Sequence, residues 1–350
     1  MTPFPGHPSH GIGKTRVRDD VAMTDSSQRG SGAMPEVPLG ASGLQVSRLA
    51  LGSWRTFERI ARDDGLAVMR AAREAGITFL DDARYNDETG TAPIPSGYSE
   101  VVFGELFRAA GWRRDEVVVA NKLWWEFWPD ETPADELAGS LGRMGLDHVD
   151  LIYTDTLPPG VPLADAVDMI TRLISAGLAR AWGAFNWPPA ALEQAWRIGD
   201  LHGVPGPTAT QPAYSLIRRE LVEDPEMELV ASQRGIAIVA SYALAGGVLT
   251  GKYAAYPEAG RAAGQLAAPP YAAGLAAGRE LAALAAELGR DPAQLALAFA
   301  LLNPSVTTVL FGATSPAQVT ANVGALAVAA GLTAEETARL QAIGRPVAAG

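Results

Sequence analysis

The sequence has 350 residues, 48% of them hydrophobic, so it can form one large α/β domain or two ordinary ones. Its formal net charge of -11 argues against nucleic acid or an anionic membrane as a partner, although a small anionic cofactor needs only a local positive pocket. The lack of cysteine excludes disulfides and thiolate metal sites, and the four histidines predict no metal site. The sequence has no apolar run of transmembrane length and no signal peptide, which predicts a cytoplasmic protein.

Short apolar segments that suit buried strands alternate along the chain with amphipathic segments that suit helices. Residues 1–34 have no such pattern, so we expect a disordered tail there and a single domain over 35–350, which opens with a hairpin over 38–51. Strands are predicted at 48–54, 77–83, 116–122, 148–155, 180–186, 208–211, 236–241 and 307–311. Helices are predicted at 64–75, 99–110, 135–144, 162–176, 190–201, 219–234 and 315–327.

The C-terminal part adds further helices to this series. A long loop rich in Gly and Ala, over 246–270, precedes helical patterns at 275–288 and 292–302, and Thr333 with Glu336 predicts a capping box at the start of a last helix. Eight strands that alternate with helices predict a (β/α)8 barrel of the TIM type. The alternative, an open doubly wound sheet, would carry a Gly-x-Gly-x-x-Gly turn after its first strand, whereas this strand ends in Gly52-Ser53-Trp54-Arg55-Thr56-Phe57.

Ionisable side chains follow two of the predicted strands. Asp81 and Tyr85 come at the end of the second strand, and Lys122 comes at the end of the third. In a parallel barrel these ends meet at one rim. A carbonyl group that receives a hydride needs a nearby proton donor, and a phenol can serve if an ammonium group lowers its pKa and a carboxylate fixes the ammonium. The three residues are therefore a candidate proton-donating site.

Several short motifs occur in a fixed order at the predicted strand ends. They include Phe79-x-Asp81-x-Ala83, Asn121-Lys122, Gly183-x-x-Asn186, Gln211-x-x-Tyr214-Ser215-Leu216, Leu249-Thr250-Gly251-Lys252-Tyr253 and Gly312-Ala313-Thr314-Ser315-Pro316-x-Gln318. With these motifs the chain, from about residue 38 to its C-terminus, resembles the aldo-keto reductases. The resemblance implies NADP(H)-dependent, metal-free reduction of an aldehyde or ketone, with catalytic roles for Asp81, Tyr85 and Lys122.

Two departures from the family pattern leave alternatives open. The family's Tyr usually stands one residue further along, where this chain has Asn86, and a segment over 87–95 is inserted after it, so Tyr98 could replace Tyr85. The family's His after the fourth strand is replaced here by Asp155. A protonated Asp155 could donate to the substrate oxygen, as in relatives that reduce enones, whereas an ionised Asp155 could act as a base in dehydrogenation or epimerisation of alcohols or sugars.

The resemblance also implies a nicotinamide cofactor and favours NADP(H) over NAD(H). The residues expected to bind it are Gly52, Trp54, Asn186, Gln211, Tyr214, Ser241, Leu244, Gly246, Lys252, Gly312, Thr314, Ser315, Gln318 and Asn322. Tyr214 is expected to stack on the nicotinamide ring, and Arg261 is a further candidate for the pyrophosphate. Ser315 is expected to open a helix, and a helix N-terminus favours phosphate.

The loop after Lys122 is unusually aromatic. Trp124 and Trp125 in this loop, together with Trp54, are expected to bind a bulky or aromatic substrate at the mouth of the barrel. A small molecule is thus the expected partner, while the sequence predicts no oligomeric state. The alternative to an enzyme is a regulatory NADP(H)-binding subunit, because the cytoplasmic subunits of potassium channels are related proteins.

Overall fold

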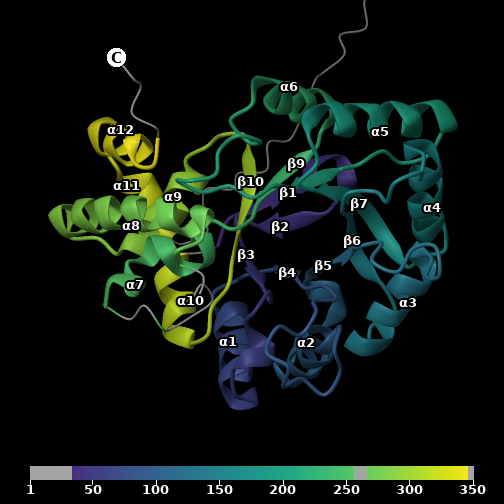
Figure 1. Cartoon of the computed structure of the whole chain (residues 1–350), viewed down its shortest axis with the longest axis horizontal. Helices are drawn as coiled ribbons and strands as arrows, with labels where there is room; N and C mark the ends of the chain where they lie inside the picture. The colour runs from purple at the N-terminus through teal and green to yellow at the C-terminus, as the bar shows by residue number, and fades with distance from the viewer. Residues whose placement is uncertain (1–33, 256–257, 259–265, 346–350) are drawn as a thin grey trace, which may run out of the picture. The chain divides into compact units, whose positions relative to one another are not determined.

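Eight parallel strands form a closed barrel with helices around it (Figure 1), which confirms the predicted fold class. This computed structural model describes residues 34–255, 258 and 266–345, so the expected tail lies almost entirely outside the described residues. The strands of the barrel are β3 (Leu49–Gly52), β4 (Phe79–Asp81), β5 (Val118–Leu123), β6 (Val149–Thr154), β7 (Ala179–Phe185), β8 (Ala209–Gln211), β9 (Ala237–Ala240) and β10 (Val306–Phe311). Pairing of β10 with β3, where Val309 lies opposite Leu49, closes the barrel.

Helices cover the outside of the barrel. Those that follow individual strands are α1 (Arg62–Glu74), α2 (Tyr98–Ala109), α3 (Pro133–Met144), α4 (Leu163–Ser175), α5 (Pro189–His202), α6 (Pro225–Arg234) and α10 (Pro316–Val323). The others are α7 (Lys252–Ala255), α8 (Pro269–Leu288), α9 (Pro292–Leu301), α11 (Ala325–Gly331) and α12 (Ala334–Ala342). α9 packs against α8, α11 and α12, and these helices gather on one side of the barrel in Figure 1.

Some helix boundaries differ from the predicted ones. The helix predicted over 219–234 begins only at Pro225, because the Asp224 carboxylate caps it by accepting the backbone N–H of Glu226. The helix predicted over 315–327 is divided at Gly324, a poor helix former. The capping box predicted at Thr333 is present at the start of α12. Part of the predicted loop over 246–270 lies outside the described residues, and its start forms a 3-10 helix, η4 (Ala245–Thr250).

The alternation of side chains along the strands creates two apolar cores. One lies between the barrel and the helices, and the other fills the barrel interior with small residues such as Ala50, Ala120 and Ala181. The antiparallel hairpin of β1 (Glu36–Pro38) and β2 (Gln45–Ser47) adds apolar side chains to the interior core. The hairpin therefore closes the amino end of the barrel.

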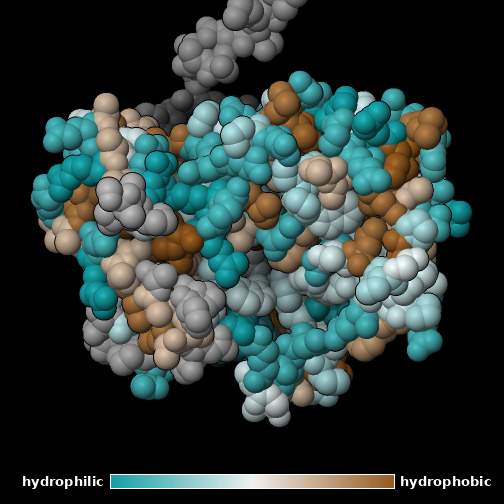
Figure 2. Space-filling model, turned by 45° about the horizontal axis from the view of Figure 1, so that its top comes forward, coloured by the Kyte–Doolittle hydropathy of each residue, from teal (hydrophilic) through white to brown (hydrophobic). Residues whose placement is uncertain are grey.

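The surface carries scattered apolar side chains. On the face drawn in Figure 2, hydrophobic residues form separate patches among hydrophilic ones. Among the residues that the structure describes, the large hydrophobic ones that are exposed are Phe127, Leu201 and Leu229. Among the helices that the structure describes, none is both long and apolar enough to cross a membrane.

Candidate active site

Each strand of the barrel brings one expected site residue to the same rim. These residues stand at the last position of their strand or one position to either side, and from β3 to β10 they are Gly52, Asp81, Lys122, Asp155, Asn186, Gln211, Ser241 and Gly312. The carboxyl ends of parallel strands lie on one face of a barrel, which is where barrel enzymes place their active sites. The structure thus gathers residues from the whole length of the chain into one place.

Alternation along the strands turns Asp81 and Lys122 into the barrel. Val118 and Ala120 belong to the interior core, so Lys122, two residues further along β5, points inward as well. Both charged residues are 2% exposed, and Lys122 Nζ lies 2.5 Å from Asp81 Oδ1. The second carboxylate oxygen, Oδ2, accepts a hydrogen bond of 2.8 Å from Gln211 Nε2. Gln211 therefore holds the carboxylate that in turn holds the ammonium.

The Tyr85 hydroxyl is the phenol beside this ammonium. Lys122 Nζ lies 3.4 Å from Tyr85 Oη, in hydrogen-bond range. Tyr98, the alternative phenol, instead accepts a hydrogen bond of 2.8 Å from Arg62 Nη2. The structure therefore places Tyr85, and not Tyr98, next to Lys122.

The pKa of Tyr85 is displaced in the opposite direction to the expected one. Burial raises the pKa of the Tyr85 hydroxyl well above its ordinary value, and nearby carboxylates, foremost Asp81 and Asp82, add to the rise. The phenol consequently carries its proton at neutral pH, and the protonated form is the one that a proton donor requires.

Asp82 is a buried carboxyl group that the sequence patterns did not single out. It accepts a short hydrogen bond from Ser53 Oγ, while its Oδ2 atom is buried without a hydrogen-bond partner in the described part of the chain. Burial raises the pKa of Asp82 well above its usual range, and the Glu100 carboxylate raises it further. These effects favour the protonated form of Asp82, the residue that follows Asp81.

Asp155, at the position of the family's His, lies immediately after β6. Its backbone N–H donates to the carbonyl of Leu123 at 2.9 Å, and its own carbonyl accepts the Trp187 indole N–H at 3.1 Å. These bonds fix the backbone of Asp155 next to the end of the strand that carries Lys122. Burial raises the pKa of its half-buried carboxyl group, which favours the protonated form that can donate to a substrate oxygen.

Aromatic side chains form a wall beside Tyr85. The ring of Trp124 lies 6.0 Å from that of Tyr85 and meets the ring of Phe185 edge-on at 5.6 Å. Phe185 ends β7 and is absent from the predicted substrate-binding residues. Its place at the end of a strand is a sequence feature that could have indicated it. Trp125, which is expected to contact the substrate, is 5% exposed, and its indole donates to Thr154 Oγ1 at 2.8 Å.

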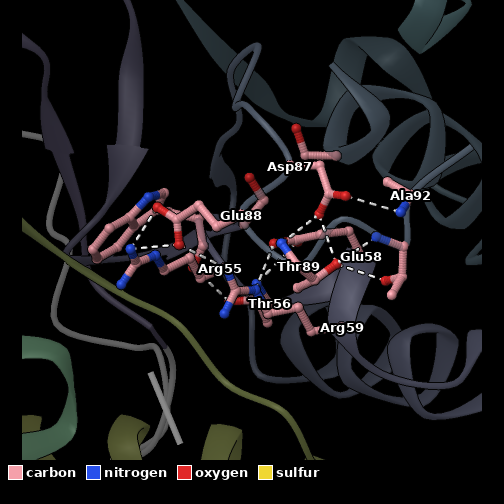
Figure 3. A network of polar contacts seen from close by, with 12 residues as sticks. Arg55, Thr56, Glu58, Arg59, Asp87, Glu88, Thr89 and Ala92 are labelled. Carbon is pink, nitrogen blue, oxygen red and sulfur yellow. Dashed lines mark hydrogen bonds and ion pairs between the residues drawn. The ribbon is translucent and has the colours of Figure 1, made fainter. Parts of the chain in front are cut away.

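The inserted segment borders the same mouth. Within it, the Thr89 hydroxyl and the Ala92 amide donate to the Asp87 carboxylate and lower its pKa to about 2. Glu88 forms ion pairs with Arg55 and Arg59, which follow β3 (Figure 3). The segment therefore lies against the loop after β3, and both contribute to a small cavity that Tyr85 also lines.

Comparison with known proteins identifies the family of this chain. A model of the aldo/keto reductase family matches residues 48–345. The chain belongs to this family. Aldo/keto reductases are oxidoreductases and typically bind NADP(H). Among the residues that the structure describes, no group of three or more His, Cys, Asp or Glu side chains could hold a metal ion.

Three related aldo/keto reductases carry the name of a channel subunit. A probable voltage-gated potassium channel subunit beta of Oryza sativa subsp. japonica is 34% identical, over 87% of this chain and 95% of the relative. The Arabidopsis thaliana protein of the same name is 32% identical over 83% and 90% of the two chains. A putative subunit of this kind from Schizosaccharomyces pombe is 33% identical over 85% and 89%.

Two features of this aldo/keto reductase fit the phosphates of a nicotinamide cofactor. In η4, Gly246 and Gly247 have φ of 65° and 90°, and a Cβ at Gly247 would lie 2.8 Å from Lys252 Nζ. Glycine thus lets the ammonium lie against the backbone of a tight turn, which is an arrangement that suits anions. At the start of α10, Ser315 accepts the Gln318 N–H as a helix cap. Arg261 lies outside the described residues.

The other expected cofactor residues differ in exposure. Thr314 and Gln318 are exposed and bonded to each other, since the Thr314 N–H donates to Gln318 Oε1 at 2.8 Å. Asn322 faces inward from α10 and is 4% exposed. Asn186, exposed with φ of 56°, accepts the Ala213 N–H at 2.8 Å. The half-buried side chains of Trp54 and Leu244 lie on the same rim.

Tyr214, which is expected to stack on the nicotinamide ring, lies in the core of this structure. Its side chain is 2% exposed, and its hydroxyl contacts Glu223 Oε1 and Asn303 Nδ2, each at 3.1 Å. Burial raises the pKa of Tyr214 to about 12.

Tyr242 is an aromatic residue of the rim that sequence reasoning missed. It follows Ser241 at the end of β9, has φ of 59°, and its ring lies 6.2 Å from that of Trp54. The Arg55 guanidinium lies 4.7 Å above Trp54, and that of Arg218 lies 5.1 Å above Tyr242. Aromatic faces and cations thus occur together on this part of the rim.

Proposed function

We propose that this aldo/keto reductase is an NADPH-dependent reductase of aldehydes or ketones, with Tyr85 as the proton donor. The contact of 3.4 Å between Lys122 Nζ and Tyr85 Oη carries the proposal. Reduction of a carbonyl group needs a donor for the oxygen, a cation that stabilises the phenolate left behind, and a carboxylate that fixes the cation. Tyr85, Lys122 and Asp81 meet these requirements in that order.

The chain's residues would act as follows. When bound, the cofactor supplies a hydride to the carbonyl carbon. As negative charge develops on the carbonyl oxygen, Tyr85 Oη transfers its proton to that oxygen. The Lys122 ammonium then stabilises the tyrosinate, while Asp81, fixed by Gln211, keeps the ammonium in position. Burial of this pair excludes water and strengthens each interaction.

The residues at the mouth support a bulky or aromatic substrate. Trp124 and Phe185 stand beside Tyr85, and Trp54 pairs with Tyr242 on the rim. A protonated Asp155 would add a second donor for the substrate oxygen, which extends the proposal to enones. The same residue, if ionised, would suit the reverse reaction on alcohols or sugars.

The test is a panel of aliphatic and aryl aldehydes, ketones and enones, followed through the absorbance of NADPH. Wild-type protein should oxidise NADPH with aryl carbonyls, and Tyr85→Phe should lose about 10²- to 10⁴-fold in turnover while it retains NADPH binding. Turnover of Tyr85→Phe at the wild-type rate would remove Tyr85 from the mechanism. A parallel assay with alcohols and NADP would detect the reverse reaction.

A second candidate function is that of an NADP(H)-binding regulatory subunit. It rests on the names of three relatives with 32–34% identity, which are named as probable or putative voltage-gated potassium channel beta subunits. Tight NADPH binding without turnover of any compound in the panel, together with association with a channel protein, would favour it over the reductase.

A further inference from the structure

We propose that Arg84 and Glu136 are positioning residues that hold the aromatic loop, residues 124–128, at a fixed place beside the Tyr85 phenol, and so determine how well the site accepts aryl carbonyls. The proposal deepens the reductase function and rests on it for its kinetic readout. Both side chains are nearly inaccessible, with 4% and 3% exposure, and Arg84 Nη2 lies 2.9 Å from Glu136 Oε1.

Glu136 connects this ion pair to the loop. Its Oε1 atom accepts the backbone N–H of Trp124 at 2.9 Å, and its Oε2 atom accepts that of Trp125 at 3.2 Å. Glu136 stands in the first turn of α3, which is anchored to the barrel by buried residues such as Leu137. A single carboxylate thus fixes two successive amides of the aromatic loop to a rigid helix.

Arg84 connects the same carboxylate to the phenol. It directly precedes Tyr85, and its guanidinium also contacts Glu131 at 2.6 Å and lies 5.0 Å from the ring of Phe127. The backbone that carries Tyr85 and the loop that carries Trp124 are therefore joined through one guanidinium. Any shift of the loop would change the ring distance of 6.0 Å between Trp124 and Tyr85.

The energetics of this ion pair favour a positioning role over a purely stabilising one. Burial of two charges costs desolvation energy, so an apolar pair of similar volume is often at least as stabilising. Burial raises the pKa of Glu136, against the effect of the Trp124 amide and of Arg84, and Arg84 Nε is buried without a hydrogen-bond partner among the described residues. A group that is this costly to bury is better explained by the geometry that it imposes.

The amino end of the barrel offers a matched control. Arg114 Nη1 lies 2.7 Å from the buried carboxylate of Asp150, which keeps a second partner in Arg180. In the same way, Glu136 keeps the two loop amides when Arg84 is replaced. Arg84→Met and Arg114→Met therefore each remove one cation from a buried carboxylate, but only Arg84 lies next to Tyr85.

The experiment compares kcat/KM for an aryl aldehyde and for a small aliphatic aldehyde. Arg84→Met should lower the aryl-to-aliphatic ratio roughly tenfold, because small displacements of positioning groups have large effects on rate. Arg114→Met should leave the ratio at the wild-type value, and Arg84→Lys should restore part of it. An unchanged ratio in Arg84→Met would overturn the proposal.

A second measurement keeps the proposal testable if Arg84→Met fails to fold or if no carbonyl is turned over. Residue-resolved hydrogen exchange on the wild-type protein should show slow exchange of the Trp124 and Trp125 amides, and Glu136→Gln should accelerate it at least tenfold. Fast exchange of both amides in the wild-type protein would refute the proposed role of Glu136. If the wild-type protein turns over no carbonyl but its Trp124 and Trp125 amides exchange slowly, the reductase function is refuted and the positioning role of Glu136 is not.

Discussion

The two ends of the barrel treat buried carboxylates differently. At the amino end, Asp150 of β6 is 1% exposed and is paired with both Arg114 and Arg180. At the carboxyl end, Asp82 is fully buried, accepts a hydrogen bond from Ser53, and leaves Oδ2 without a partner in the described residues. Asp150 thus has a cation at each of its carboxylate oxygens, whereas one oxygen of Asp82 has no hydrogen-bond partner among the described residues.

The same contrast holds for other polar groups. Arg84 Nε and Trp124 Nε1 at the carboxyl end are buried without hydrogen-bond partners among the described residues. Arg114 Nε at the amino end is also unpartnered, but the terminal nitrogens of this residue contact Asp150 and the carbonyls of Val117 and His148. Since an unmade hydrogen bond costs stability, we expect the amino end to contribute more to stability and the carboxyl end to contribute more to the proposed function.

The largest effect that would test this contrast is expected for Lys122→Met. Turnover should fall about 10³-fold, because the tyrosinate loses its cation. The free energy of unfolding should fall by about 3–5 kcal/mol, because Asp81 is left as an uncompensated buried charge. Steady-state rates and urea denaturation measure the two effects.

The double variant Asp81→Asn/Lys122→Met separates function from stability. It should regain most of the lost stability, because no buried charge remains, while turnover stays low. Recovery of turnover in the double variant would show that the ion pair serves structure alone.

Asp150→Ala, unlike Lys122→Met, should lower stability without lowering the activity of the folded protein. Loss of a buried carboxylate leaves Arg114 without its charged partner and should lower the free energy of unfolding by about 3 kcal/mol in urea denaturation. The kcat/KM of the folded protein should stay at the wild-type value, because Asp150 lies at the far end of the barrel. A decrease in kcat/KM like that of Lys122→Met would contradict the proposal that the amino end serves stability and the carboxyl end serves activity.

The fold and the centre of the site could be predicted because they follow from regular periodicity. Apolar runs mark the strands, and the two-residue alternation that places Phe79 and Val118 in the interior also turns Asp81 and Lys122 inward. The late start of α6 at Pro225 also had a local signal, since Asp224-Pro225 is a typical helix opening.

The remainder of the site depends on conformations that periodicity does not encode. Tyr242 reaches the rim through a backbone with φ of 59°, which a sequence pattern of strand ends does not reveal. Arg84 and Glu136 are separated by 52 residues and meet only because the loop between β5 and α3 folds back. Tyr214 was placed by resemblance, and neighbouring helices bury it.

Asp155→Asn should have a smaller, pH-dependent effect at the carboxyl end. Because burial raises the pKa of Asp155, its protonated fraction exceeds that of an exposed aspartate at the same pH and falls as pH rises. If the protonated group donates to the substrate, reduction slows as pH rises through this raised pKa, by roughly fivefold for a hydrogen bond of about 1 kcal/mol.

The asparagine variant keeps a donor at every pH, so the slope should disappear from its profile of kcat against pH. Asp155→Ala is the control, since it should be slow at every pH. A profile of Asp155→Asn that keeps the wild-type slope would assign the titration to another group.

The smallest effect is expected for Glu88→Gln in the inserted segment. Glu88 has 45% side-chain exposure, so its ion pairs with Arg55 and Arg59 are screened by solvent and contribute less than about 1 kcal/mol. Thermal unfolding at low and high salt should show a loss that shrinks as salt is added. A loss as large as that of Asp150→Ala would mean that the exposed rim stabilises the barrel as strongly as the buried amino end.

The hairpin of β1 and β2 restricts the routes by which a ligand could enter and leave the barrel. Its side chains Leu39, Leu44 and Val46 plug the barrel, and Gly40 docks so tightly that a Cβ there would lie 2.3 Å from the carbonyl oxygens of Gly235 and Thr208. Among the described residues the amino end of the barrel is thus closed, and Tyr85 lies at the opposite, carboxyl end. If Tyr85 is the proton donor, a bulky residue or a covalent label placed beside it should block substrate entry and product release together.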